Sequence, residues 1–361
     1  RMTVASIAAA VSDPNASKLS FFKAAAAEGK SQAAWTRSGA GSGLSLTAAG
    51  SAAVATTTLG TSAWIDGAVV VGKDSGTVTT DVAASNATIA ELGSGSAALN
   101  LTGASSPLSG ALSGAVSIGI FDNSTDARIS DSTITGAGDT TVQALAGGRQ
   151  TVVGVSIAAA RANSGAAAIS GAIGLITDSV TAQIERSAIA GISGASSGND
   201  VLVNAYRTTD IGIGGGAAYA GAQAGLGMAF TYVSIADPSG RDAVAALVTD
   251  SSIGAMDRLS VVARTSSRIA SGAIAGGGGP NSNGLAGAFV INDVSPTTRA
   301  AVTDGAGAPA RIAMDGDVIV LADSGRDATL DAALASRMAA TDPGQIDFSG
   351  SATNADGAAN P

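Results

Sequence analysis

The sequence predicts an all-β protein, a solenoid in which similar strands stack from one repeat to the next as a parallel β-helix. Short motifs recur at intervals of about 60 residues, and each motif alternates apolar and polar side chains with the period of a strand. The chain has 361 residues with 49 glycines and only 3% aromatic side chains, so its core must pack small residues closely. A row of independent β-sandwich domains would need larger apolar side chains than two tryptophans and three tyrosines provide.

The first motif is Ala, any residue, then Ile or Val, and its five copies are 64, 55, 64 and 54 residues apart. The copies are Ala63–Ile65, Ala127–Ile129, Ala182–Ile184, Ala246–Val248 and Ala300–Val302. Each middle copy is followed at the same offset by a Ser-x-Ile strand, namely Ser132–Ile134, Ser187–Ile189 and Ser251–Ile253. We expect an internal ladder of stacked residues, Ile129, Ile184, Val248 and Val302, with three neighbours exposed, Arg128, Gln183 and Thr303.

The second motif is an Asp followed by alternating apolar residues and a closing Ala. Its closing residues, spaced by 61, 58 and 59, are Ala144, Ala205, Ala263 and Ala322. Gly/Ala-rich runs fill the rest of each period as hairpin-like pairs over residues 152–176, 211–233 and 269–291. We therefore expect five or six short strands in each period.

The outward positions of the Gly/Ala-rich runs carry tiny side chains where an ordinary strand would be polar. They are Gly212, Gly214, Gly216, Ala218 and Ala220, and similarly Gly165, Ala167, Gly171 and Gly174. Small side chains allow sheets to approach more closely than the usual distance of about 10 Å. We expect this stripe to pack on another sheet of the chain or on a second copy, which would give fibres.

We expect three regions. Residues 1–37 form an irregular or capping segment, 38–325 the solenoid, and 326–361 a partly helical or irregular segment, with short helices over Ser20–Trp35 and Asp327–Ala340. If three strands make one coil, each period supplies two coils, and the chain holds about 12 coils in a rod of about 55 to 60 Å. Since the chain begins at Arg1 without a signal-peptide pattern, we expect a piece of a longer or processed protein.

The composition excludes several classes of function. The chain has no His and no Cys, which removes Ser-His-Asp and Cys-His triads and the usual zinc sites. The missing cysteines also fit export through a cell envelope. A net charge of −9 makes a nucleic-acid partner a poor prediction. The uncharged stretch Ile211–Ala236 is long enough to span a bilayer, but its many glycines argue against a helix, so we predict no membrane span.

Aspartates are the remaining candidates for catalysis. Asp122, Asp126 and Asp131 could face one another as paired carboxylates for glycoside cleavage. Asp122 lies in the turn-like sequence Asp-Asn-Ser-Thr, and Asp126 lies beside the outward face. We interpret these residues as parts of capped turns and predict no catalytic residue.

Three further patterns suggest ligands. Asp315-Gly316-Asp317 offers hard oxygen atoms that suit Ca²⁺, although it matches neither an EF-hand nor a β-roll repeat. Gly212–Gly216 and Gly276–Gly279 are not followed by the residues of a phosphate-binding loop. Aromatic residues that could stack on sugars are scattered over different repeats: Trp35, Trp64, Tyr206, Tyr219 and Tyr232. We predict no cofactor and no metal site, with Ca²⁺ the one ion left open.

The repeat resembles the β-strand repeats of giant bacterial surface proteins, the filamentous-haemagglutinin and leukotoxin-type adhesins exported by type V secretion. The resemblance covers about residues 38–324 and rests on the Gly/Ala run, the T-x-A-x-I strand at Thr125–Ile129, and the S-x-I and D-x-V-x-A strands. It implies a right-handed parallel β-helix outside the cell with little or no enzymology. The chain departs from the leukotoxin-like members by using Arg and Asp where they usually have Lys and Glu.

Two classes of function follow. The first is a structural or adhesive extracellular rod that contacts host cells, matrix or surface polysaccharide and associates with itself through Gly/Ala-rich faces. The second is a carbohydrate-active β-helix enzyme, a hydrolase or lyase that uses aspartates. An enzyme of that kind needs long loops over a cluster of acids, and the connections predicted here are short. We therefore predict the rod and no enzyme.

Overall fold

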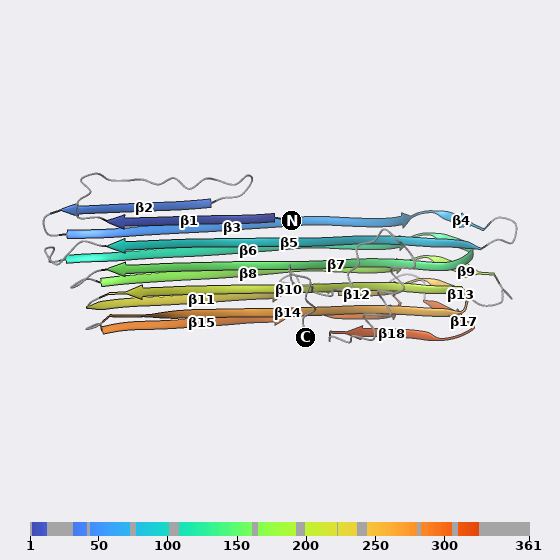
Figure 1. Ribbon diagram of the computed structural model, residues 1–361. Coiled ribbons are helices and arrows are strands. Elements are labelled where there is room, and N and C mark those ends of the chain that lie inside the picture. The colour runs from blue at the N-terminus through green and yellow to red at the C-terminus, as the bar shows by residue number, and fades with distance from the viewer. Residues whose placement is uncertain are drawn as a thin grey trace, which may run out of the picture.

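The computed structural model describes residues 2–12, 32–41, 44–72, 77–100, 108–160, 165–192, 199–221, 223–236, 244–279, 283–304 and 310–324. Within these ranges every regular element is a β-strand, and the strands form two sheets that pack face to face (Figure 1). The predicted all-β class is confirmed. The expected helix over Asp327–Ala340 lies outside the described residues, as does the one over Ser20–Trp35 except for its last four residues, which begin a strand.

Sheet A has ten strands: β1 (Met2–Ser12), β4 (Val69–Val71), β5 (Val78–Asn100), β7 (Thr133–Ala160), β9 (Ala188–Gly191), β10 (Asp200–Ala220), β13 (Ser252–Met256), β14 (Arg258–Gly278), β17 (Arg311–Met314) and β18 (Val318–Asp323). Sheet B has eight: β2 (Gln32–Gly41), β3 (Leu44–Asp66), β6 (Leu108–Ser130), β8 (Gly165–Glu185), β11 (Ala224–Ala236), β12 (Val244–Thr249), β15 (Asn283–Ser295) and β16 (Thr298–Thr303). All pairings among these strands are parallel except that of β2 with β3.

The pairing is parallel because neighbours in a sheet are one sequence period apart. The chain runs along sheet B in β6, turns a corner at Ser130–Ser132, returns along sheet A in β7, and enters sheet B again as β8. In the stack Ala127 pairs with Ala182, and Ala182 with Ala246. Along sheet A, Ala144 pairs with Ala205, and Ala205 with Ala263. The spacings of both motifs therefore give the register in which neighbouring strands of the two sheets pair.

The expectation of about 12 coils is wrong, because each period adds one layer to each sheet and not two. The residues that we assigned to separate short strands form continuous long ones: β8 joins a Gly/Ala-rich run to the Ala182–Ile184 motif without a turn. A strand of 21 residues is about 70 Å long, whereas five steps between six stacked strands span about 24 Å. The long dimension therefore runs along the strands and not along the stack (Figure 1).

The array also begins earlier than expected. We placed residues 1–37 in an irregular segment, but β1 lies in sheet A and pairs with β5 from Met2 to Ser12. Alternation explains why this stretch joins the sheet, because Val4, Ser6 and Ala8 all point inward and are buried.

The predicted internal ladder is confirmed. Ile129 pairs with Ile184, Ile184 with Val248, and Val248 with Val302. The first three side chains are fully buried, and Val302 in the last described layer is half-buried. Their neighbours Arg128, Gln183 and Thr303 point outward but are half-buried rather than exposed.

The Gly/Ala-rich runs are not hairpins. In the run 152–176, the end of β7 lies in sheet A and the start of β8 faces it from sheet B. A Cβ at Gly154 of β7 would overlap the backbone oxygen of Gly171 in β8, so the backbones of the two sheets nearly touch here. Between the sheets at this end the core is mostly alanine, whereas at the corner end it is rich in Ile and Val.

Candidate functional site

The three candidate catalytic aspartates are not brought together. Asp122 and Asp126 lie on the outer face of β6, four residues and therefore about 13 Å apart along the strand. Asp131 lies at the corner beyond β6, in the left-handed conformation with φ of 48°. Burial raises the pKa of Asp126, and the nearby Arg128 opposes the shift. A glycosidase pair requires carboxyl groups about 5 to 9.5 Å apart, and Asp122 and Asp126 do not meet this.

The Asp315–Asp317 segment fits its neighbour layer through its backbone. The N–H of Asp315 donates to the carbonyl of Met256 at 2.9 Å, and the carbonyl of Asp317 accepts from the N–H of Leu259 at 3.0 Å. A Cβ at Gly316 would lie 2.5 Å from the carbonyl oxygen of Asp257, so glycine is needed for this close approach. Among the described residues, no group of three or more acidic side chains could hold a metal ion.

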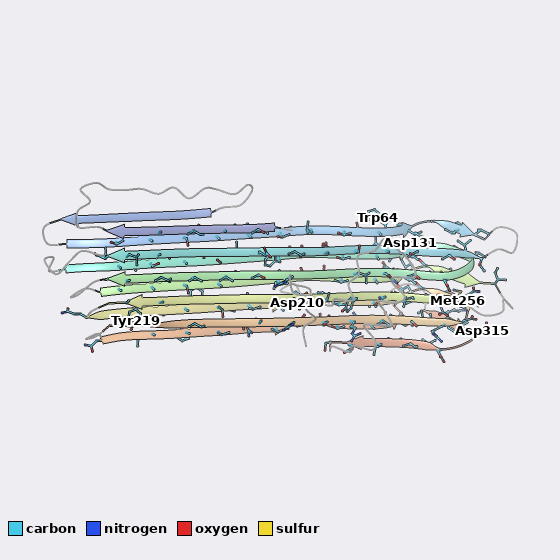
Figure 2. All side chains as sticks on the ribbon, viewed as in Figure 1. Trp64, Asp131, Asp210, Tyr219, Met256 and Asp315 are labelled. Atoms are coloured by element: carbon cyan, nitrogen blue, oxygen red, sulfur yellow. The ribbon has the colours of Figure 1, made fainter. Side chains whose placement is uncertain are left out.

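The glycine runs and the aromatic residues are dispersed. Gly212–Gly216 lie within β10, and Gly276–Gly278 end β14, so neither run forms a loop. Trp64 points outward near the corner end, whereas Tyr219 is buried between the sheets at the opposite end (Figure 2). Tyr206 and Tyr232 lie half-buried on the outer faces of sheets A and B, and the side chain of Trp35 lies outside the described residues.

The corner after β6 and β8 is built from a ladder of serines. The Ser132 hydroxyl donates to the carbonyl of Ser130 at 2.6 Å, and the Ser187 hydroxyl donates to that of Glu185 at 2.7 Å. The Ser187 Oγ also accepts from the N–H of Ser132, and the Ser251 Oγ accepts from the N–H of Ser187, both at 3.2 Å. The S-x-I motif is thus a hydrogen-bonded turn motif as well as a strand.

The residues before the serines carry charge on the outside of this corner. Asp131, Arg186 and Asp250 all have φ between 46° and 50° and stack on one another. Arg186 donates to both carboxylate oxygens of Asp131, at 2.7 and 2.8 Å, and this hydrogen bonding holds the pKa of Asp131 below 3.8. These residues and Arg311 line a shallow depression of about 390 Å³. Because both partners are nearly half exposed, the ion pair contributes little to stability.

A buried polar cluster lies between the sheets near their middle, and sequence reasoning missed it. The Asn123 side-chain amide donates to Oδ1 of Asp178 at 2.8 Å, and Nη1 of Arg207 donates to the Asp178 carbonyl at 3.0 Å. Burial raises the pKa of Asp178, against the opposing effects of Asn123 and Arg207, and burial lowers the pKa of Arg207. The alternation of the D-x-V-x-A motif could have predicted the position of Arg207. This residue lies two positions beyond the inward-facing Ala205, so its side chain also points inward.

The outer face of sheet B carries a large apolar surface, which we call the sheet B patch. Its members alternate with the inward residues of five stacked strands. They are Leu46, Ala48, Gly50, Ala52 and Val54 of β3; Leu112, Gly114, Val116 and Ile118 of β6; Ala167, Ile169, Gly171 and Ile173 of β8; Leu226, Met228, Phe230 and Tyr232 of β11; and Leu285, Gly287, Phe289 and Ile291 of β15. Asp122 and Asp293 mark its border toward the corner end.

The outer face of sheet A is smoother. Here Gly212, Gly214, Gly216, Ala218 and Ala220 point outward, as expected. Beside them lie exposed Val155 and Ile157 of β7. The row Arg149, Asp210 and Arg268 borders this face toward the corner end. Of the other small residues expected to be outward, Gly165, Ala167 and Gly171 lie on sheet B, whereas Gly174 points inward against Ile213.

Among the described residues, no helix is long and apolar enough to cross a membrane. Comparison with known proteins gives no further assignment. No family model matches the chain, and neither a curated protein nor a solved structure matches it.

Proposed function

We propose that the chain is a structural, adhesive part of an extracellular bacterial surface protein, folded as a right-handed parallel β-helix. The observation that carries the proposal is that residues one motif spacing apart pair with each other in the sheets. Ala127, Ala182 and Ala246 are stacked in this way in successive layers. Chains built this way extend by adding repeats, which suits a scaffold that presents surface. The right hand is supported by the strong preference of connections between parallel strands of one sheet.

In this proposal the chain is not an enzyme, and it needs neither a cofactor nor a metal ion. The separation of Asp122 from Asp126 on one strand supports this over the carbohydrate-active alternative. Its partners are surfaces of host cells, matrix or polysaccharide, together with other copies of the chain through the Gly/Ala-rich outer face of sheet A. Nucleic acid is an unfavourable partner for a chain of net charge −9.

The proposal is tested on the purified chain coated on beads. We expect the beads to attach to cultured cells, matrix proteins or immobilised polysaccharide more than beads coated with an unrelated acidic protein, and to release no sugar from any polysaccharide. Asp122→Asn with Asp126→Asn serves as the matched control and should leave attachment unchanged. Polysaccharide cleavage that this double variant abolishes would establish the enzyme instead.

Localisation and bundling are separate parts of the proposal. Antibody against the chain should label intact cells of the bacterium that produces it, and label seen only after lysis would contradict an extracellular position. In electron micrographs the chain should form bundles that the double variant Gly214→Arg with Ala218→Arg separates. Unchanged bundling in this variant would show that the outer face of sheet A is not a contact surface.

A further inference from the structure

Most of the sheet B patch is exposed or half-buried in a single copy of the chain, whereas Ala48, Gly50 and Gly171 are buried. Leu112, Ile169 and Met228 are each about two-fifths exposed, at 41, 39 and 38%. Contiguous apolar surface larger than several hundred Å² is rare on a free soluble protein and usually marks a contact. The patch borders on charge at one end, because Asp122 and Asp293 lie just beyond it.

The area of the patch is that of a small protein interface. Five strands about 4.8 Å apart and about seven residues of about 3.3 Å each give about 550 Å². Two copies would together bury about 1,100 Å², which is slightly more than the roughly 1,000 Å² that a biological interface needs. The patch is therefore large enough to hold a second protein surface without a contribution from the rest of the molecule.

The patch has its smallest side chains on β3 and its largest on β11. β3 contributes Ala48, Gly50 and Ala52, whereas β11 contributes the much larger Leu226, Met228 and Phe230 at the corresponding positions. A two-fold axis that lies in the interface and runs along the central strand β8 places β6 of one copy opposite β11 of the other. The same axis places β3 opposite β15. Gly114 of β6 then faces Met228, and Ala48 and Ala52 of β3 face Leu285 and Phe289, which is the self-complementarity that a two-fold contact requires.

We propose that a second copy of this chain covers the sheet B patch, in a two-fold dimer whose axis runs along β8. The dimer rests on the proposed function in one respect: that function requires contacts between copies, and the dimer would supply one of them. It uses the opposite sheet from the Gly/Ala-rich face of sheet A, so the two contacts are separable. A groove of about 750 Å³ at the Leu46 end of the patch, lined by Gly110, Gly165, Ala224 and Leu285, offers room for partner side chains.

Charge disfavours an anionic lipid surface as the occupant of the patch. The chain carries a net charge of −9, and the carboxylates of Asp122 and Asp293 lie at the border of the patch, so an anionic membrane would repel it. In addition, the described part of the patch lacks the Lys and Arg residues that attract anionic lipid. A dimer needs no such residues, because its contact is apolar on both sides.

The first test is the oligomeric state, measured by sedimentation equilibrium. In the Gly214→Arg with Ala218→Arg background, which removes the proposed contact through sheet A, the chain should be a dimer. Ile169→Lys with Met228→Lys, added to this background, should weaken the dimer on the order of 100-fold in Kd. The matched control is Val155→Lys with Ile157→Lys on sheet A, where the exposed fractions are similar at 41 and 46%. This control should retain the dimer, and circular dichroism should show native strand content in both variants.

The second test does not depend on a destabilising charge. Because the chain has no cysteine, a single Ile169→Cys creates the only thiol. Ile169 lies on β8 at the proposed axis, so its two copies should meet and form a disulfide-linked dimer on mild oxidation. Ile157→Cys on sheet A should remain largely unlinked under the same conditions when Gly214→Arg and Ala218→Arg remove the proposed contact through that face.

Several outcomes would overturn the dimer. They are a wild-type monomer at high concentration, equal dissociation of both lysine variants, or equal cross-linking of both cysteine variants. Co-sedimentation of a monomeric wild-type chain with phosphatidylcholine vesicles would replace the second copy by lipid. If the chain is monomeric and beads coated with it still attach, the proposed function stands and the dimer is wrong. If the chain is a dimer and cleaves polysaccharide, the dimer stands and the proposed function is wrong.

Discussion

Asn123 and Asp178 occupy neighbouring strands of sheet B, and the amide of Asn123 donates a 2.8 Å hydrogen bond to the Asp178 carboxylate inside the protein. Arg207 reaches this site from the opposite sheet. A buried carboxylate is tolerated here because a donor and a positive charge compensate its lost hydration. The three residues place charged side chains between the sheets, in an interior that also holds buried hydroxyl groups such as those of Ser94 and Ser117.

Removing the positive charge should destabilise the protein in a pH-dependent way. In Arg207→Met, the carboxylate of Asp178 loses its compensation, so we expect a loss of about 3 kcal/mol at pH 7. Burial already raises the pKa of Asp178 above 3.8, and the substitution raises it further. Protonated Asp178 has no charge that needs compensation, so the loss of stability should be small at pH 4. The loss should grow as the pH rises toward the pKa of Asp178 in the folded variant.

Urea denaturation at pH 4 and pH 7 measures this difference. Arg149→Met, which changes an exposed arginine on the outer face of sheet A, is the control and should cost less than about 0.5 kcal/mol. An equal loss at both pH values for Arg207→Met would mean that packing, and not the charge of Asp178, determines the effect.

The register of β8 predicts opposite outcomes for two adjacent residues. Ile184→Asp would place an unpaired charge in the fully buried ladder and should cost about 4 kcal/mol or more. Gln183→Asp points outward beside Arg128 and should change stability by less than about 0.5 kcal/mol. Chemical denaturation of both variants checks this, and similar losses would show that the two side chains do not face opposite sides.

The serine ladder should contribute measurably to the corner. Ser187→Ala removes the hydroxyl that donates to the Glu185 carbonyl and accepts from the N–H of Ser132, so it should cost about 1 to 3 kcal/mol. The Ser132 amide should then exchange its hydrogen faster. Ser179→Ala, on the outer face of β8 before the corner, should leave both stability and exchange nearly unchanged.

The close approach of the sheets can be tested with two glycines on neighbouring strands. Gly154→Ala would force its Cβ into the backbone of Gly171 and should cost about 1 to 3 kcal/mol. At Gly214 a Cβ would meet only Val153 methyl groups at 3.9 Å, so Gly214→Ala should be neutral or stabilise by about 0.5 kcal/mol. Thermal unfolding of both variants is sufficient, and equal destabilisation would contradict the different environments of these glycines.

The repeat spacing made the register predictable, because in parallel stacked layers the partner of Ala182 is one period away on either side. The number of layers was not predictable in the same way. Alternation continues through Ile176 and Val180 into Ala182, and a sequence pattern of period two does not show whether such a run bends or continues straight. The structure shows that it continues, which doubles the length of sequence in each layer.

The sites were less predictable than the fold, because we assigned charged residues to solvent and small residues to the contact surface. Arg207 is charged yet buried, since Asp178 compensates it from a strand 29 residues away in sequence. Met228 and Phe230 are large yet outward, and only their neighbours in other layers show that they form one surface. Such relationships depend on which strands face each other, which the motifs alone do not specify.

The orientation of the strands determines how a molecule of this design changes with the number of its repeats. Each further period would add about 4.8 Å across the strands and nothing along them. Duplication of repeats would therefore produce a plank of constant width, set by the roughly 70 Å strands, and not a thin needle. Every added layer would also add one row to both outer faces, so the area available for contact would grow in direct proportion to the length of the gene.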